Sequence, residues 1–319
     1  MTTQFAPICL FTYNRLEETV HAVEALKRNF LAKESDLYIF SDGPKNVSAE
    51  EKVQEVRNYI KAIKGFKSIT IYESAVNKGL ARSITEGATE ILKQFGKIIV
   101  LEDDLISSPN MLNFMNQALD YYQDMPKVFS ISAFGHQLKL PEGYDYDVYL
   151  RGRPYSWGWG TWIDRWNSVD WAVGDWEVFK KDKRRIKAFN RFGSDLFKTL
   201  EDCMAGKNNS WAIKFAYSQF KQNRITVSPR YSKIVNCGFG KDATHCEATY
   251  NRHKVLFDNT DQKVFKFTNE LELIPEISKQ LADYNSVSSR LKSKVLNCLI
   301  EKGVISSINN INVITNEEQ

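Results

Sequence analysis

Short β-rich runs alternate with segments of helical periodicity over the first third of the chain. The β-rich runs are short and are bounded by polar or turn-forming residues; they cover residues 8–13, 37–40, 68–72 and 97–101. Between them, apolar positions recur at helical spacing over residues 16–30, 49–63 and 80–95. Strands that alternate with helices predict an α/β fold built on a parallel sheet with helices on both faces.

The rest of the chain shows a different pattern. Residues 144–176 are rich in aromatics and glycine, which favours loops around a binding wall over another strand and helix repeat. A helix is expected from Trp211 to Asn223 and a strand at 225–227, and the tail beyond Phe265 is expected to be mostly helical and charged. The tail therefore looks like an appendage to the main fold.

Polar residues follow each predicted strand of the first third. They are Asn14-Arg15, Ser41-Asp42-Gly43-Pro44, Asn77-Lys78-Gly79 and Glu102-Asp103-Asp104. In an open parallel sheet, ligands bind beyond the carboxyl ends of the strands, so these residues are expected to converge on one site.

The triplet Glu102-Asp103-Asp104 places three carboxylates directly after a buried strand. Mg²⁺ and Mn²⁺ take oxygen ligands, commonly one or two carboxylates together with substrate phosphates. The triplet therefore predicts a divalent metal site, although a solvated acidic turn explains it equally well when it is taken alone.

Four other features have a chemical and a structural interpretation. Asp42 could hydrogen-bond a base or ribose, or simply belong to a tight turn. Lys78 and Arg82 suit a diphosphate or simply belong to a helix N-terminus. His245 suits the diphosphate or the metal, or is a structural histidine. Trp157, Trp159 and Trp162 could stack on a sugar ring or lie in the core.

Composition narrows the alternatives without selecting a ligand. Among the 319 residues, 43% are hydrophobic, which is enough for a full core, and the net charge of +4 does not require nucleic acid. The five cysteines have no short spacing that would suggest zinc binding, and a reducing cytoplasm is expected. No apolar stretch is long enough to span a bilayer, so any membrane contact is expected to be peripheral.

Several of these motifs, in this order, resemble the donor half of inverting GT-A glycosyltransferases. The similarity is to the bacterial family 2-like group related to animal N-acetylglucosaminyltransferase I. It covers about residues 5 to 250 and includes the opening from Pro7 to Arg15, the segments after the strands, the run 156–162 and the pair Thr244-His245. The resemblance implies a GT-A fold, a Rossmann-like mixed sheet flanked by helices, here with a C-terminal helical extension.

The resemblance also implies roles for individual residues. Asp104 would ligate Mn²⁺ or Mg²⁺, Glu102 and Asp103 would contact the donor, and Asp42 would contact the base, uracil being favoured. The remaining nucleotide-sugar contacts are expected from residues of the matching segments, namely Thr12, Asn14, Arg15, Lys78, Arg82, Trp159 and His245, the last also as a metal ligand.

One departure from the family concerns the catalytic base. The family places an aspartate just before a tryptophan at the head of a helix, but Asn208, Asn209 and Ser210 precede Trp211 here. An amide cannot accept the proton, so another carboxylate is needed. Asp164 and Asp202 are the predicted candidates, with Asp170 as a third.

The sequence therefore predicts a metal-dependent glycosyltransferase of the hexosyltransferase type. Residues 1–105 would bind the nucleotide sugar, 106–255 the acceptor, and 256–319 would form the appendage. A glycan or lipid-linked acceptor of surface polysaccharide or lipopolysaccharide synthesis is expected from the resemblance. A nucleotidyltransferase and a non-catalytic sugar-binding module remain as alternatives.

Overall fold

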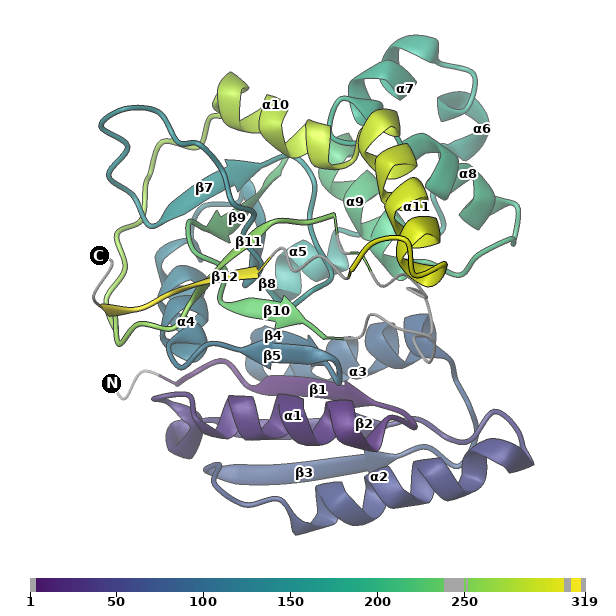
Figure 1. Ribbon diagram of the computed structural model, residues 1–319, viewed down its shortest axis with the longest axis vertical. Helices are drawn as coiled ribbons and strands as arrows, with labels where there is room; N and C mark the ends of the chain where they lie inside the picture. The colour runs from purple at the N-terminus through teal and green to yellow at the C-terminus, as the bar shows by residue number, and fades with distance from the viewer. Residues whose placement is uncertain (1–3, 238–249, 251, 307–310, 317–319) are drawn as a thin grey trace.

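An eight-stranded mixed sheet forms the centre of the computed structural model, which describes residues 4–237, 250, 252–306 and 311–316 (Figure 1). The strand order is β3-β2-β1-β4-β8-β6-β9-β7. The strands are β1 Ile8–Thr12, β2 Asp36–Ser41, β3 Ser68–Glu73, β4 Lys97–Glu102, β6 Val128–Ser132, β7 Val148–Arg151, β8 Trp159–Trp162 and β9 Ile225–Pro229. The predicted α/β class, with a Rossmann-like mixed sheet flanked by helices, is confirmed.

Helices cover both faces of this sheet. One core contains residues of α1 and α2, which link the first strands, together with residues of α4; the opposite core contains residues of α3, α5 and α9. Alternate residues of β1 and β4 enter the two cores, as Leu10 and Phe11 of β1 do. The helices are α1 Leu16–Lys27, α2 Glu50–Ala62, α3 Leu80–Phe95, α4 Met111–Tyr121, α5 Ile163–Asn167 and α9 Trp211–Lys221, with short 3₁₀ turns η1 Ala32–Glu34 and η2 Val47–Ala49.

The expectation of loops throughout residues 144–176 is wrong at the centre of the sheet. Trp159–Trp162 forms β8, which lies antiparallel between β4 and β6. A side chain at Gly160 would lie 2.9 Å from the carbonyl oxygen of Ile98, so a residue without Cβ is needed where this strand crosses the core. The glycine suggested a loop in the sequence, but it permits close packing in the structure.

Three short helices form a smaller lobe beside α9. They are α6 Trp176–Phe179, α7 Lys183–Asn190 and α8 Leu196–Met204. Their apolar residues, among them Phe179, Phe189 and Leu200, share a separate core with Tyr217 of α9. This lobe lies at the upper right of Figure 1, far from α2 and β3.

The C-terminal region begins as an integrated part of the main fold. Phe265 packs edge-on against Phe114 of α4, and the Tyr122 hydroxyl donates to the Thr268 carbonyl at 2.9 Å. The predicted helices follow, although two strands flank them. The elements here are β11 Val255–Asp258, α10 Pro275–Tyr284, α11 Val287–Glu301 and β12 Ile311–Ile314, while β5 Leu105–Ser107 pairs with β10 Ile234–Asn236. No helix in the described part of the chain has the length and apolar character needed to cross a membrane.

A buried ion pair anchors the start of this C-terminal region. The Lys233 ammonium contacts the Asp258 carboxylate, and the two side chains are 3% and 0% exposed. Burial raises the pKa of Asp258, but Lys233 and hydrogen bonds from Thr260 outweigh burial and hold this pKa below its usual value. Asp258 therefore stays ionised opposite a buried cation.

We expect Asp258→Asn to lower the free energy of unfolding by about 3–5 kcal/mol, because it leaves the Lys233 ammonium buried without a counter-charge. Urea denaturation followed by circular dichroism measures this change. The exposed pair of Asp145 and Lys266 provides the control, and Asp145→Asn should have little effect. Adding Lys233→Met to Asp258→Asn should recover part of the loss, and no recovery would contradict the explanation.

Candidate functional site

The carboxyl ends of β1, β2 and β4 lie together at one edge of the sheet. The parallel registers place Thr12 beside Ser41 and Phe11 beside Glu102. The polar segments that follow these strands therefore meet, as the sequence predicts for the first, second and fourth runs. We call this edge the carboxyl edge.

At the carboxyl edge, three consecutive carboxylates lie near one guanidinium, which forms ion pairs with two of them. Arg15 contacts the Asp103 carboxylate and donates to Asp104 Oδ2 at 3.1 Å, and the backbone N–H of Tyr13 donates to Asp103 Oδ2 at 3.3 Å. Burial, followed by the charges of Asp104 and Asp103, raises the pKa of Glu102 to about 8. Burial also raises the pKa of Asp103 to about 6, with Arg15 opposing the shift. Among the residues that the structure describes, the cluster has more carboxylates than nearby positive charges.

The donor chemistry of this cluster fits a divalent cation that is shared with a substrate. Among the residues that the structure describes, no three His, Cys, Asp or Glu side chains are arranged as a complete metal site. Mg²⁺ and Mn²⁺ do not require such a cage when phosphate oxygens and waters complete the coordination shell. The side chain of Asp104 is 15% exposed and could supply the carboxylate. His245, the other predicted ligand, lies outside the described residues.

Asp42 ties two loops of the carboxyl edge together. Its carboxylate accepts from the backbone N–H groups of Lys78 and Gly79 at 2.8 and 2.9 Å, and from Asn77 Nδ2 at 3.2 Å. Gly43 allows this approach, because a Cβ there would lie 2.4 Å from the carbonyl carbon of Val76. Asp42 thus fixes the start of α3, and its predicted contact with a base would have to use its remaining hydrogen-bonding capacity.

One residue that sequence reasoning missed supports the same loops. Arg57 of α2 donates to the carbonyl oxygens of Asp42 at 3.3 Å and Ser74 at 2.7 Å. It lies in the middle of an amphipathic helix with no motif around it, so only its tertiary contacts reveal this role.

The predicted diphosphate ligands Lys78 and Arg82 both contact Glu86. The Lys78 ammonium lies 2.7 Å and the Arg82 Nε 2.6 Å from its carboxylate oxygens. All three side chains are more than 30% exposed, so these pairs are weak and a diphosphate could displace them. Arg82 and Glu86 also line a hollow of about 530 Å³ between α3 and α9.

The structure corrects the prediction for two tryptophans. Trp159 and Trp162 are 2% and 3% exposed and belong to the two cores. Trp159 packs against Trp166 and Trp211, with ring centroids 5.6 and 5.1 Å apart, so no face remains for a sugar. Trp157 is only partly buried and is the one member of the three that stays near the surface.

The structure also argues against Asp164 as the base. Asp164 follows β8, whose last residue pairs with Lys97 at the start of β4, and it is therefore at the opposite edge of the sheet from Asp104. The length of β4 alone separates the two edges by roughly 20 Å. Asp164 is 59% exposed and paired with Arg165.

The other two candidates occupy different places. Asp170 bonds Lys221 and the Gly174 N–H, near the end of α9. Asp202 lies near the end of α8, where the neighbouring Cys203 thiol donates to the carbonyl oxygen of Ser210 before α9, and its carboxylate contacts Lys198 at 3.0 Å. Because α9 ends just before β9 begins at the far edge, its first turn points toward the carboxyl edge. At that turn Ser210 Oγ accepts from the Ile213 N–H and caps the helix.

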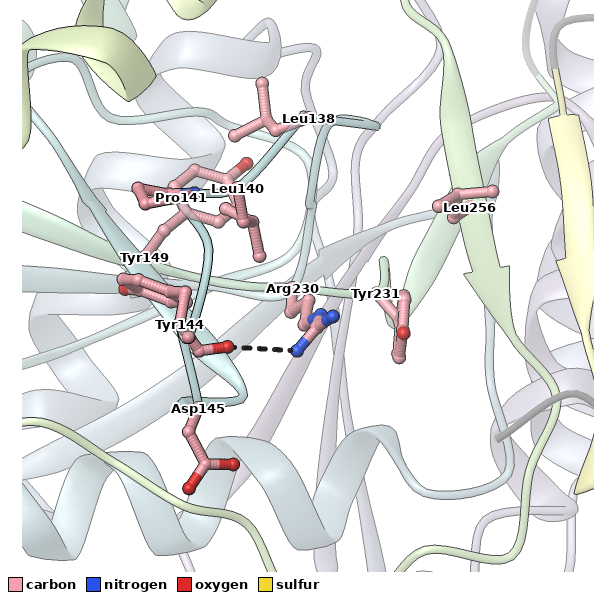
Figure 2. Close-up of a pocket in the computed structure, with 10 residues that line it drawn as sticks. Leu138, Leu140, Pro141, Tyr144, Asp145, Tyr149, Arg230, Tyr231 and Leu256 are labelled. Atoms are coloured by element: carbon pink, nitrogen blue, oxygen red, sulfur yellow. Dashed lines mark hydrogen bonds between the residues drawn. The ribbon is translucent and has the colours of Figure 1, made fainter.

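A second cavity lies farther along the same edge of the sheet. It has a volume of about 480 Å³ and lies where β9 ends and β7 begins, roughly 15 Å from β4 across the sheet (Figure 2). Figure 2 shows Arg230 between the backbone of Tyr144 and the ring of Tyr231, and the Arg230 guanidinium donates to the Tyr144 carbonyl at 3.5 Å. The wall combines aromatic rings, leucines and this cation.

Comparisons with known proteins give fold similarities only. No protein-family model matches the chain, and no curated protein matches it. Among solved structures, residues 1–349 of S. aureus TarS are similar at 10% identity and a TM-score of 0.39, over 72% of this chain and 59% of that one. The chain thus spans less than two thirds of the TarS fragment.

Two further solved structures show likeness at the same level. The mannosyltransferase PcManGT from Pyrobaculum calidifontis, in complex with GDP-Man and Mn²⁺, has 11% identity and a TM-score of 0.36, over 68% of this chain and 74% of that one. A UDP-glucose pyrophosphorylase complexed with UDP-glucose has 15% identity and a TM-score of 0.36, over 73% and 94%.

The raised pKa of Glu102 makes a prediction about stability. A carboxyl group whose pKa is higher in the folded state than in the unfolded state costs stability as pH rises between the two values, here from about 4.5 to about 8. We expect Glu102→Gln to raise the free energy of unfolding at pH 8 in chelator by at least about 1 kcal/mol, the equivalent of one pKa unit. Denaturation at pH 5 and pH 8 measures the difference.

The matched control for this experiment is Glu55→Gln on the exposed surface of α2. It should leave the stability unchanged at both pH values. Equal free energies of unfolding for the wild type and Glu102→Gln at pH 8 would show that ionisation of Glu102 does not destabilise the fold.

Proposed function

We propose that this chain is a metal-dependent glycosyltransferase that transfers a sugar from a nucleotide sugar to a glycan or lipid-linked acceptor. The observation that carries the proposal is the surplus of carboxylates over cations, counted among the described residues, at the carboxyl edge where β4 emerges from the core beside the ends of β1 and β2. The sequence resemblance to inverting GT-A enzymes supports the same assignment. UDP is the favoured nucleotide from that resemblance.

Each group at the edge has a proposed task. Asp104 would hold Mn²⁺ or Mg²⁺, which supplies positive charge to a diphosphate leaving group when bound. Arg15 orients the Asp103 and Asp104 carboxylates through its contacts with both, and Asp42 holds the loop that starts α3. Lys78 and Arg82 would leave Glu86 for the diphosphate, whose charge is greater.

For the proton of the acceptor hydroxyl, Asp202 is the candidate that we retain. It lies near the first turn of α9, which is the place where the family carries its base, whereas Asp164 is at the wrong edge. Lys198 would have to release Asp202 for it to act, and Asp202→Asn in a transfer assay tests this assignment.

The first test of the transferase proposal is release of free nucleoside diphosphate from a panel of nucleotide sugars. We expect release with Mn²⁺, none with chelator, and a loss of roughly a hundredfold or more in Asp104→Asn, because the cation loses its carboxylate. Asp124→Asn, at an exposed position with no ion pair among the described residues, is the matched control. Donor binding by calorimetry without turnover of any donor would favour a sugar-binding module instead.

We also propose that the cavity of Figure 2 binds a sugar of the acceptor some distance from the site of transfer. Its volume of about 480 Å³ and its tyrosine rings suit a carbohydrate, whose apolar faces pack on aromatic side chains. Its place on the carboxyl edge would let an extended acceptor reach both sites.

Saturation-transfer NMR with methyl glycosides tests this subsite. We expect contacts from the sugar ring in the wild type, and roughly tenfold weaker binding in Tyr231→Ala, which removes one aromatic wall. Tyr72→Ala, a half-exposed tyrosine on β3, is the control. Signals of equal strength in Tyr231→Ala and wild type would exclude the cavity as the place of binding.

A further inference from the structure

The segment around α7 is a strongly basic surface. Between residues 180 and 191 there are seven cations and a single carboxylate, Asp182. Lys180 and Arg185 form ion pairs with Glu177 and Asp175. The other five cations are exposed and have no ion pair among the described residues; they are Lys181, Lys183, Arg184, Lys187 and Arg191. We call these five residues the basic patch.

The placement of these cations is not favourable for the helix itself. Lys183 and Arg184 lie in the first turn of α7, which contains no acidic residue, and the positive end of the helix dipole repels them. Asp182 compensates in part, because its side chain accepts from the N–H groups of Arg184 and Arg185. Folding alone does not explain this concentration of charge.

Helix α11 exposes an apolar stripe. Val287, Leu291 and Val295 recur every four residues, so they lie on one face, and they are 55%, 57% and 58% exposed. Helical periodicity places the exposed Lys292 and Lys294 on either side of this face. An apolar stripe flanked by lysines is the pattern of a helix that lies in a membrane interface.

The two features are neighbours. Arg290 in the first turn of α11 donates to Ser194 Oγ at 2.9 Å, and Ser194 lies three residues beyond the basic patch. Ser194 in turn donates to the carbonyl of Asn285, just before α11. Figure 1 shows α7 and α11 on the same side of the molecule, away from α1 and α2.

We propose that the basic patch and the apolar stripe of α11 together form a docking surface for an anionic phospholipid membrane. The five cations of the basic patch supply long-range attraction to the lipid headgroups, and each contributes about 1 kcal/mol near such a surface. The apolar stripe inserts shallowly into the lipid interface, where its side chains leave water. A soluble polyanion offers no such apolar environment. Charge and apolar exposure on one side of the protein therefore select a lipid surface as the partner.

Sedimentation with vesicles tests the proposal on the full chain. We expect binding to phosphatidylcholine vesicles that contain a quarter phosphatidylglycerol, release at high salt, and little binding to pure phosphatidylcholine. Changing Lys183, Arg184, Lys187 and Arg191 to Gln should weaken binding roughly a hundredfold or more. Leu291→Ser with Val295→Ser should weaken it roughly tenfold, because less apolar surface leaves water.

Matched controls lie on the far side of the sheet. Four other exposed cations without ion pairs among the described residues, Arg28, Lys33, Lys52 and Lys64, can be changed to Gln together, and Val47→Ser removes a side chain that is 79% exposed. These changes should leave vesicle binding within about twofold. Circular dichroism establishes that each variant is folded.

Three outcomes would overturn the proposal. They are equal binding to neutral and anionic vesicles, equal loss in the control variants, and binding to soluble polyphosphate without binding to vesicles. Release of nucleoside diphosphate in solution, which needs none of these residues, is measured on the same samples. A protein that turns over donor but does not bind vesicles would refute the docking surface and leave the proposed function standing. Binding to anionic vesicles without turnover of any donor would support the docking surface and count against the proposed function.

Discussion

The concentration of three carboxylates at the end of β4 is the constraint on which the arrangement of the site depends. β4 is buried between β1 and β8, so its last residues leave the core where water cannot fully solvate their charges. Arg15 neutralises only part of that charge. It reaches the cluster because β1 lies parallel and adjacent to β4. The loops from β2 are then held close by Asp42 and Arg57, whose hydrogen bonds go to backbone groups. The close carboxylates thus lower the stability of the fold when they are ionised. A cation bound together with a phosphate ligand would neutralise their charge.

Much of the first half of the fold could be predicted, because there the local and the tertiary signals agree. The strands of the parallel block read as short apolar runs and the helices as amphipathic segments, and the residues after β1, β2 and β4 meet as expected. β8 could not be recognised in the same way. Its two tryptophans and its glycine are typical of loops, and only the narrow space beside Ile98 and Met115 explains why a glycine occupies the centre of a sheet.

The candidate site was predictable where a short motif carries its own chemistry, as at Glu102, Asp103 and Asp104. It was not predictable where position in space decides the role. Asp164 follows an aromatic motif in the sequence, but the direction of β8 places it at the wrong edge of the sheet. Trp159 is of a residue type that often stacks on sugar rings, but it is buried in the core. Arg57 shows the opposite failure, since a residue without any motif supports two loops of the site.

The net charge of +4 conceals a strong separation of charge within the molecule. Carboxylates gather at the end of β4, whereas cations gather on α7, in a lobe with its own small core. That lobe can therefore carry like charges without disturbing the sheet, since its packing depends on Phe179, Phe189 and Tyr217. An anionic surface would attract the lobe and repel the carboxylates, so it would orient the protein as well as hold it.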